Sequence, residues 1–266
     1  MAALRLAPAL VMALLASPGL ASATGCFPVA SAPSPLLHLA GLRTLAAIPA
    51  GATVQLTFLG HASFLIETAR GVTAVTDYNA YVRAPVTPDI VTMNNAHDSH
   101  YTDFVDPAVK HTLRGWNPAG GEAQHDVTLD DLRVRNIPTS VHGRSGSQGN
   151  SNSIFVFEAS DLCVAHLGHL HHELTREHLG EIGQIDVLMV PVDGAYTMAQ
   201  DQMARVIDSI GAPLVIPMHY FGSSTLARFL SHVDDTHEVV YAEAPSVALS
   251  RATLPASPRV PVLPGR

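Results

Sequence analysis

Many of the fifteen histidines in this chain of 266 residues directly follow apolar, strand-like runs. Imidazole is a common metal ligand and a general base near neutral pH. In α/β proteins, strand ends on one side of a sheet are where sites are assembled. One such histidine is more often solvated or hydrogen-bonded than a ligand, but five strand ends together favour a metal site. The histidines concerned are His61, His97, His100, His142, His169, His171, His172 and His219.

Short strands alternating with a few helices must position these histidines. Apolar or alternating runs predict strands at 54–58, 63–67, 73–77, 185–192, 212–218 and 237–242. Residues 152–159 and 161–168 predict a hairpin. Helices are predicted over 175–183, 203–210 and 223–233, the second with Met203, Val206, Ile207 and Ile210 on one face and Gly211 as its stop. We therefore expect a strand-rich α/β domain whose sheets are covered by helices.

The chain divides into four segments by composition. Residues 1–25 predict a signal peptide or lipoprotein leader, and residues 26–52, rich in Ala, Pro and Leu, predict an N-terminal tether. Residues 53–250 form the predicted domain. Residues 251–266 carry prolines at every third position from 255 to 264, which predicts an extended tail outside the core.

The leader predicts export to a bacterial envelope. A positively charged start is followed by the apolar run Leu6–Ala16 and the cleavage-type triplet Ala21–Ala23. Cys26 ends a faint lipobox, so lipid attachment stays open, and such an anchor is the one membrane contact we expect. A disulfide would tie a mobile tail to a core strand, so Cys163 is interpreted as a small buried hydrophobe.

Charge and motif counts exclude several classes of function. The net charge is −8 and no Lys/Arg cluster occurs, which argues against nucleic-acid binding and leaves a small molecule as the expected partner. No G-x-S-x-G elbow is present. An S-x-x-K pair is excluded because Pro107 stands three residues before Lys110, the sole lysine.

Specific phrases in the chain resemble the metallo-β-lactamase fold. They are TFLGHASFLIET, VTDYNAY, NNAHDSHYTD, PTSVHG, AHLGHLHH and VIPMHYF, in that order. GHASFLIE and VIPMHY are similar to the branch of metal-dependent hydrolases that resembles L-ascorbate-6-phosphate lactonases. The resemblance covers about Val54 to His219 and implies a four-layer αββα sandwich.

The metal-ligand motif departs from the pattern of that superfamily. The usual H-x-H-x-D-H motif falls on residues 95–100, where Asn95 and Ser99 replace a histidine and the aspartate. His142 and His219 match later ligands, and His169 stands where a bridging aspartate is usual. Asp77 matches a buttressing aspartate.

These departures predict a rebuilt site for one metal. Losing a bridging carboxylate while gaining an imidazole suits one ion in place of two, and Zn²⁺ accepts three or four imidazoles. Fe, Mn or Ni are alternatives to zinc. We expect His97, His142 and His169 as the core of the shell, with His100 or His219 completing it.

The resemblance implies hydrolysis of an ester, lactone or phosphoester by metal-bound hydroxide. A carboxylate-poor site favours an anionic substrate, for which Arg144 is the candidate anchor. Asp98 and Asp103 are candidate proton acceptors or hydrogen-bond partners of the metal ligands, and His61 is expected to line the catalytic pocket or to hydrogen-bond a ligand. The alternative is a non-catalytic exported protein that binds metal or a ligand on the same fold.

Overall fold

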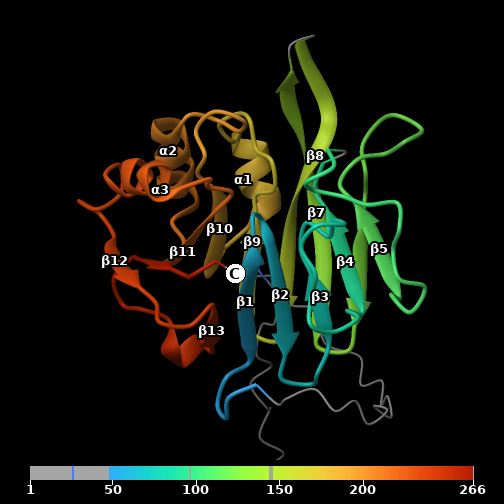
Figure 1. The fold of residues 1–266 in the computed structure, drawn as a ribbon, viewed down its shortest axis with the longest axis horizontal. Helices are drawn as coiled ribbons and strands as arrows, with labels where there is room; N and C mark the ends of the chain where they lie inside the picture. Colours follow the sequence, from blue (N-terminus) through green and yellow to red (C-terminus); the bar gives the residue numbers. More distant parts are fainter. Residues whose placement is uncertain (1–25, 27–47, 96, 144–145, 266) are drawn as a thin grey trace, which may run out of the picture.

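The computed structural model describes residues 26, 48–95, 97–143 and 146–265. Its strands form two sheets that lie face to face (Figure 1). The six-stranded sheet has the order β13 (Ser246–Leu249), β1 (Val54–Gly60), β2 (Ser63–Thr68), β3 (Thr73–Val75), β4 (Ile90–Met93) and β5 (His111–Arg114). The eight-stranded sheet has the order β12 (Glu238–Tyr241), β14 (Arg259–Val262), β11 (Leu214–Met218), β10 (Val187–Pro191), β9 (Leu162–His166), β8 (Gly146–Ala159), β7 (Leu132–Gly143) and β6 (Asp126–Leu129).

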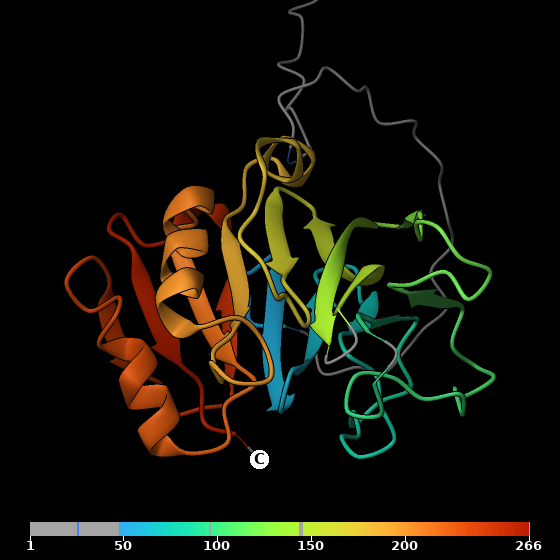
Figure 2. The same ribbon diagram turned by 90° about the horizontal axis from the view of Figure 1, so that it is seen from above.

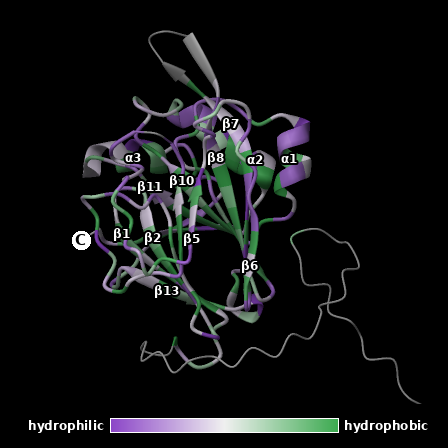
Figure 3. Ribbon diagram, turned by 90° about the vertical axis from the view of Figure 1, so that its right-hand side faces the viewer, coloured by the Kyte–Doolittle hydropathy of each residue, from purple (hydrophilic) through white to green (hydrophobic). Residues whose placement is uncertain are grey.

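A buried apolar layer joins the two sheets. Strands β1 and β2 contribute Leu56 and Phe64, and the eight-stranded sheet contributes Phe155, Met189 and Ile216, all of them 0 % exposed. Side chains alternate between the faces of a strand, so the other face of the eight-stranded sheet needs its own cover. Figure 3 shows hydrophobic residues concentrated along the strands between the layers.

Three helices cover the outer face of the eight-stranded sheet. They are α1 (Arg176–Ile182), α2 (Gln200–Ile210) and α3 (Ser223–Leu230), and a short 3₁₀ helix spans Arg251–Thr253. The apolar stripe of α2 and the buried residues of α3 share one core with strands β9 to β11 (Figure 2). The predicted two-sheet α/β class is confirmed. Among the described residues the three α-helices all lie on this one side, so they form one of the two helical layers of the predicted four-layer αββα sandwich.

The predicted helix boundaries are largely confirmed. Thr175 caps α1 by accepting a hydrogen bond from the backbone N–H of His178. Gly211 ends α2 in the left-handed conformation, which costs glycine least. Unlike α1, the helix α3 has no side-chain cap at its N-terminus, because its N-cap residue is Gly222.

The prediction that the C-terminal segment lies outside the core is wrong. Strand β14 lies between β11 and β12, and Val260 is 0 % exposed. The proline spacing suited an extended chain, and an extended chain can equally pair as a strand. Pro261 pairs with Val240 of β12, while the pairing of β14 with β11 is limited to Leu214 and Arg259 and so does not extend to the proline.

The interpretation of Cys163 as an unpaired hydrophobe is also wrong. Cys26 forms a disulfide with Cys163 and is 2 % exposed. The carbonyl of Cys26 accepts a hydrogen bond from the N–H of Gln184, which fixes this residue against the end of α1. The same sulfur cannot also carry a lipid thioether. The predicted leader and most of the tether, residues 1–25 and 27–47, lie outside the described residues.

Within the described part of the chain, no helix is long and apolar enough to cross a membrane.

Strand direction explains where a site can form. Strands β3, β4 and β5 are parallel, and β1 runs the same way because β2 is antiparallel to both β1 and β3. In the other sheet, β9, β10 and β11 are parallel. The two sets end at a common edge, where the N–H of His219 donates to the carbonyl of His61 across the sheets at 2.7 Å.

Candidate metal centre

Three histidines from different strand ends meet at this common edge. His61 follows β1, His100 lies in the loop after β4, and His219 follows β11. One ring nitrogen of each lies within 4.8 Å of the others. His100 and His219 are buried, with 0 % and 2 % exposure. Only the tertiary structure brings these residues together.

The backbone of the site adopts an unfavourable conformation at three of its residues. His61, Asp77 and His219 have φ angles of 54°, 46° and 56°, in the left-handed region that side chains with a Cβ rarely occupy. Each such residue costs of order 1–3 kcal/mol and persists where the surroundings hold it. The strain places each side chain directly at the point where its strand ends.

Asp77 orients His100. Its Oδ2 lies 2.6 Å from Nδ1 of His100, and its Oδ1 accepts a hydrogen bond from the N–H of Asn94. Burial by itself raises the pKa of Asp77, but the charge and hydrogen bond of His100 outweigh burial and lower this pKa. Asp77 is therefore an ionised acceptor, and the Nδ1 proton of His100 points to it. The predicted buttressing role of Asp77 stays a prediction, and this contact supports it.

Asp193 lies behind His219 as an ion-pair partner, although this contact lacks the hydrogen-bond geometry that Asp77 has with His100. Its Oδ1 lies 3.0 Å from Nδ1 of His219, and both groups are buried. Burial raises the pKa of Asp193, but His219 and the hydroxyl of Thr197 outweigh it and lower this pKa. A carboxylate behind an imidazole fixes its tautomer and directs the other nitrogen outward, as is usual for metal-binding histidines.

The two oriented rings face each other with their remaining nitrogens. Nε2 of His100 lies 3.3 Å from Nε2 of His219. Two nitrogens at this distance either share one proton in an N–H···N hydrogen bond or, when both present lone pairs, bind a common cation. Ligand bonds of about 2.0–2.1 Å in a tetrahedral shell place two nitrogens about 3.3–3.4 Å apart. The residues present therefore fit a metal ion.

Two further imidazoles offer nitrogens to the same region. Nδ1 of His61 and Nδ1 of His169 are buried and have no hydrogen-bond partner among the described residues. The ring of His169 lies 4.6 Å from that of His100 and 5.3 Å from that of His219, measured between centroids. Burial and the neighbouring histidines lower the pKa of His61 to about 4 and that of His169 to about 2. Both rings are neutral at pH 7, as metal ligands must be.

His97 and its neighbours lie at the outer side of this cluster. The exposed ring of His97 lies 6.1 Å from that of His100, and its Nδ1 lies 2.9 Å from the hydroxyl of Ser99. Asn95 is structural, since its amide donates to the carbonyl of Ser151. The backbone of His142 belongs to β7, but its side chain lies outside the described residues. The core of His97, His142 and His169 stays a prediction.

The remaining candidates do not reach the described cluster. Asp98 is exposed, and the exposed Asp103 pairs with Arg114 at 3.2 Å. Neither touches the three histidines through any hydrogen bond or ion pair found among the described residues. Arg144, the candidate anion anchor, lies outside them.

Sequence reasoning missed Asp193 and His166. Asp193 stands two residues after the apolar run of β10, so a carboxylate at the same kind of strand end was the available signal. His166 is the last residue of β9, is 0 % exposed, and its Nε2 lies 2.8 Å from the carbonyl of Ala62. This contact ties the two sheets together beneath the cluster, so His166 is a structural residue.

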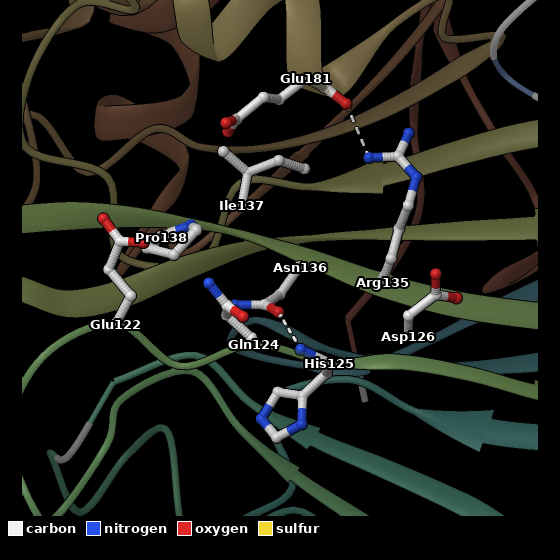
Figure 4. Close-up of a pocket in the computed structure, with 9 residues that line it drawn as sticks. All are labelled: Glu122, Gln124, His125, Asp126, Arg135, Asn136, Ile137, Pro138 and Glu181. Atoms are coloured by element: carbon white, nitrogen blue, oxygen red, sulfur yellow. Dashed lines mark hydrogen bonds between the residues drawn. The ribbon is translucent and has the colours of Figure 1, made fainter.

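A polar pocket of about 440 Å³ lies elsewhere, between β6, β7 and α1 (Figure 4). It is lined by Glu122, Gln124, His125, Asp126, Arg135, Asn136, Ile137, Pro138 and Glu181. Its guanidinium, from Arg135, already donates to Glu158 and to the carbonyls of Glu181 and Ile182. These contacts of Arg135 hold neighbouring elements together. The lining of this pocket contains one histidine, His125, and therefore no group of imidazoles like the histidine cluster.

The two packed sheets and the histidine cluster at their edge define a metallohydrolase-type fold. Residues 55–219, more than half of the chain, match the family described as the beta-lactamase superfamily domain. The chain belongs to the metallo-β-lactamase superfamily.

Known relatives agree with this assignment. A Thermotoga maritima structure assigned to the Zn-dependent hydrolases of the metallo-beta-lactamase superfamily is 30 % identical, with a TM-score of 0.60, covering 80 % of this chain and 100 % of that one. A "UPF0173 metal-dependent hydrolase" of Methanoculleus marisnigri is 28 % identical over 63 % of this chain and 81 % of its own length. A similarly named protein of Thermococcus kodakarensis is 25 % identical over 70 % of this chain and 95 % of its own.

Proposed function

We propose that this chain, a metal-dependent hydrolase of the metallo-β-lactamase superfamily, cleaves an ester, lactone or phosphoester of a small molecule. The observation that carries the proposal is the pair of Nε2 atoms 3.3 Å apart, on His100 and His219, with a carboxylate behind each ring. A single proton can bridge these two nitrogens, but two buried rings that both have a carboxylate behind them and further imidazoles beside them suit a cation better.

His61, His100 and His219 would hold the metal, with His169 completing the shell. Zinc is the ion we propose, one per chain, because neutral imidazoles in a tetrahedral arrangement suit it. When bound, such a metal acts as a Lewis acid and lowers the pKa of a coordinated water towards 7.

The protein residues keep this arrangement ready at neutral pH. Asp77 is hydrogen-bonded to Nδ1 of His100, and Asp193 lies 3.0 Å from Nδ1 of His219, so both carboxylates favour the tautomers whose Nε2 atoms are unprotonated. The low pKa of His169, about 2, keeps its ring neutral in the same range, so one of its two nitrogens has a lone pair for a metal. His100 and His219 are buried, whereas His97 is exposed at the outer side of the cluster.

The finer assignment is to a lactonase-like hydrolase of an anionic substrate with Arg144 as anchor. The phrases GHASFLIE and VIPMHY support this branch. The competing function is metal or ligand binding without catalysis. Hydrolysis of a phosphodiester or lactone by the metal-loaded protein, abolished by a chelator and restored by zinc, separates the two.

Metal content tests the ligand set directly. His100→Ala and His219→Ala should each reduce the metal-to-chain ratio from about one to near zero, measured by elemental analysis. The exposed His232 is the control, and His232→Ala should keep the full ratio. Full metal content in His100→Ala would contradict the assignment. His169→Ala and His169→Asp test the fourth position: alanine should lose metal, and aspartate should retain it.

We also propose that the chain is exported. The leader Met1–Ala23 and the disulfide of Cys26, a bond typical of oxidising compartments, support this. Intact mass of protein from the envelope fraction of a bacterial host tests it. A cytosolic chain that still carries residues 1–23 would contradict it.

A further inference from the structure

Two exposed aromatic side chains stand beside the histidine cluster. Tyr196 is 66 % exposed and Phe221 is 63 % exposed, and their ring centroids lie 5.6 Å apart with the planes at 74°. The ring of Phe221 also lies 5.5 Å from that of His219 and 6.0 Å from that of His61. We call Tyr196 and Phe221 the aromatic wall. It is continuous with the candidate metal ligands.

The loops that hold the metal ligand His219 also hold this wall in place. Phe221 comes two residues after His219. Oδ2 of Asp193 accepts hydrogen bonds from the backbone N–H groups of Ala195 and Tyr196, while Oδ1 of Asp193 faces His219. One carboxylate therefore fixes the ring of His219 and the turn that carries Tyr196. The two rings are positioned by the architecture of the site.

Exposing two large aromatic rings costs free energy unless something covers them. Burial of apolar surface is favourable in proportion to its area, and exposed aromatic residues beside a site commonly contact the ligand. The wall carries no charge. The two rings pack edge to face and present an apolar surface beside the candidate metal ligands. A part of the substrate that projects away from these ligands would lie against this surface.

From these contacts we infer that the substrate carries an apolar chain or ring next to the bond that is cleaved, and that Tyr196 and Phe221 bind this group. The inference rests on the proposed function and narrows its substrate class to small molecules with a polar head at the histidines and an apolar arm on the wall. Tyr196 and Phe221 are specificity-determining residues in this assignment.

Straight-chain alkyl hydroxamates test the inference by binding alone. Their common head group binds zinc, and chains from two to six carbons reach different distances along the wall. Complete burial of a methylene tightens binding about fourfold, so a wall on one side gives about twofold per methylene. Calorimetric titration of zinc-loaded full-length protein should show roughly 16-fold tighter binding of hexanohydroxamate than of acetohydroxamate.

Variants identify the residues responsible. Phe221→Ala and Tyr196→Ala should each reduce the ratio of the two affinities to a few-fold, whereas Phe221→Leu should preserve most of it because leucine is still apolar. Tyr241 is the control, since it is 68 % exposed but lies on β12 at the far edge of the eight-stranded sheet. Tyr241→Ala should leave the ratio unchanged.

Two other results have distinct meanings. Zinc-loaded wild-type protein that binds both hydroxamates equally well overturns the inference and leaves the proposed function intact. Protein that takes up no zinc, as measured before the titration, overturns the proposed function and the inference with it. A ratio that survives in both alanine variants also overturns the inference.

Discussion

Replacement of Asp77 by Asn tests whether the buried carboxylates prepare the metal site. Asp77 is 0 % exposed and receives the Nδ1 proton of His100 at 2.6 Å. Asparagine has nearly the same shape, so the core stays packed. Its amide nitrogen can donate to Nδ1, and the ring proton then moves to Nε2, which can no longer bind a metal.

The expected loss follows from this change of tautomer and charge. Removing the partner behind a metal-binding histidine typically costs 10- to 100-fold in affinity, which corresponds to roughly 1.4–2.7 kcal/mol. The folded protein should also lose about 1–3 kcal/mol of its free energy of unfolding, because a charge-assisted buried hydrogen bond is replaced by a weaker neutral one. Zinc affinity is measured by competition with a chelator of known affinity.

Asp186 provides the matched control. It is 4 % exposed, accepts from the N–H of Cys163 and pairs with Arg251, but it precedes β10 while the histidine cluster lies at the other end of that strand. Asp186→Asn should lower stability without weakening zinc binding. Wild-type zinc affinity in Asp77→Asn, or an equal loss in Asp186→Asn, would refute the reasoning.

Three further predictions concern stability. Replacing Cys26 by Ser should lower the free energy of unfolding by up to about 5 kcal/mol, since the disulfide closes a loop with a sequence separation of 137. Urea denaturation of the wild-type protein with and without reductant measures the same effect. An unchanged free energy of unfolding on reduction would contradict the disulfide. The metal-free protein should lose stability as the pH falls from 6.5 towards 4. In the folded protein the pKa of His61 is lowered to about 4, so the unfolded chain takes up the proton at higher pH. Midpoints of urea denaturation that do not fall between pH 7.5, 6 and 5 would contradict this prediction. Gly168→Ala should cost more than about 2 kcal/mol, since φ is +61° and the new Cβ would lie 2.4 Å from a side-chain atom of Asn94. Gly180→Ala, in the open on α1, should be neutral or stabilising, and equal losses in both variants would contradict the steric argument.

The sequence alone was sufficient for the local elements and for the class of fold. Apolar stripes and strand-like runs depend on neighbours a few residues apart, so the helix over Gln200–Ile210 and the hairpin of β8 and β9 were predicted correctly. The motifs around His61 and His219 were equally sufficient for the superfamily, because they are contiguous phrases. Histidines at strand ends also pointed to the edge of the sheets where the cluster is found.

Only the tertiary structure decided which of these groups meet. His61 joins His100 and His219 because β1, β4 and β11 end at one edge of two packed sheets, and no local pattern reports that distance. The strand-end position of Asp193 was a weak signal, and the sequence does not show that Tyr196 and Phe221 meet, since strand-end acids and exposed rings are common on any surface. The pairing of Cys26 with Cys163 and the insertion of β14 were missed for the same reason. Sequence patterns record what each residue prefers locally, whereas the contacts that make a site depend on how distant segments pack.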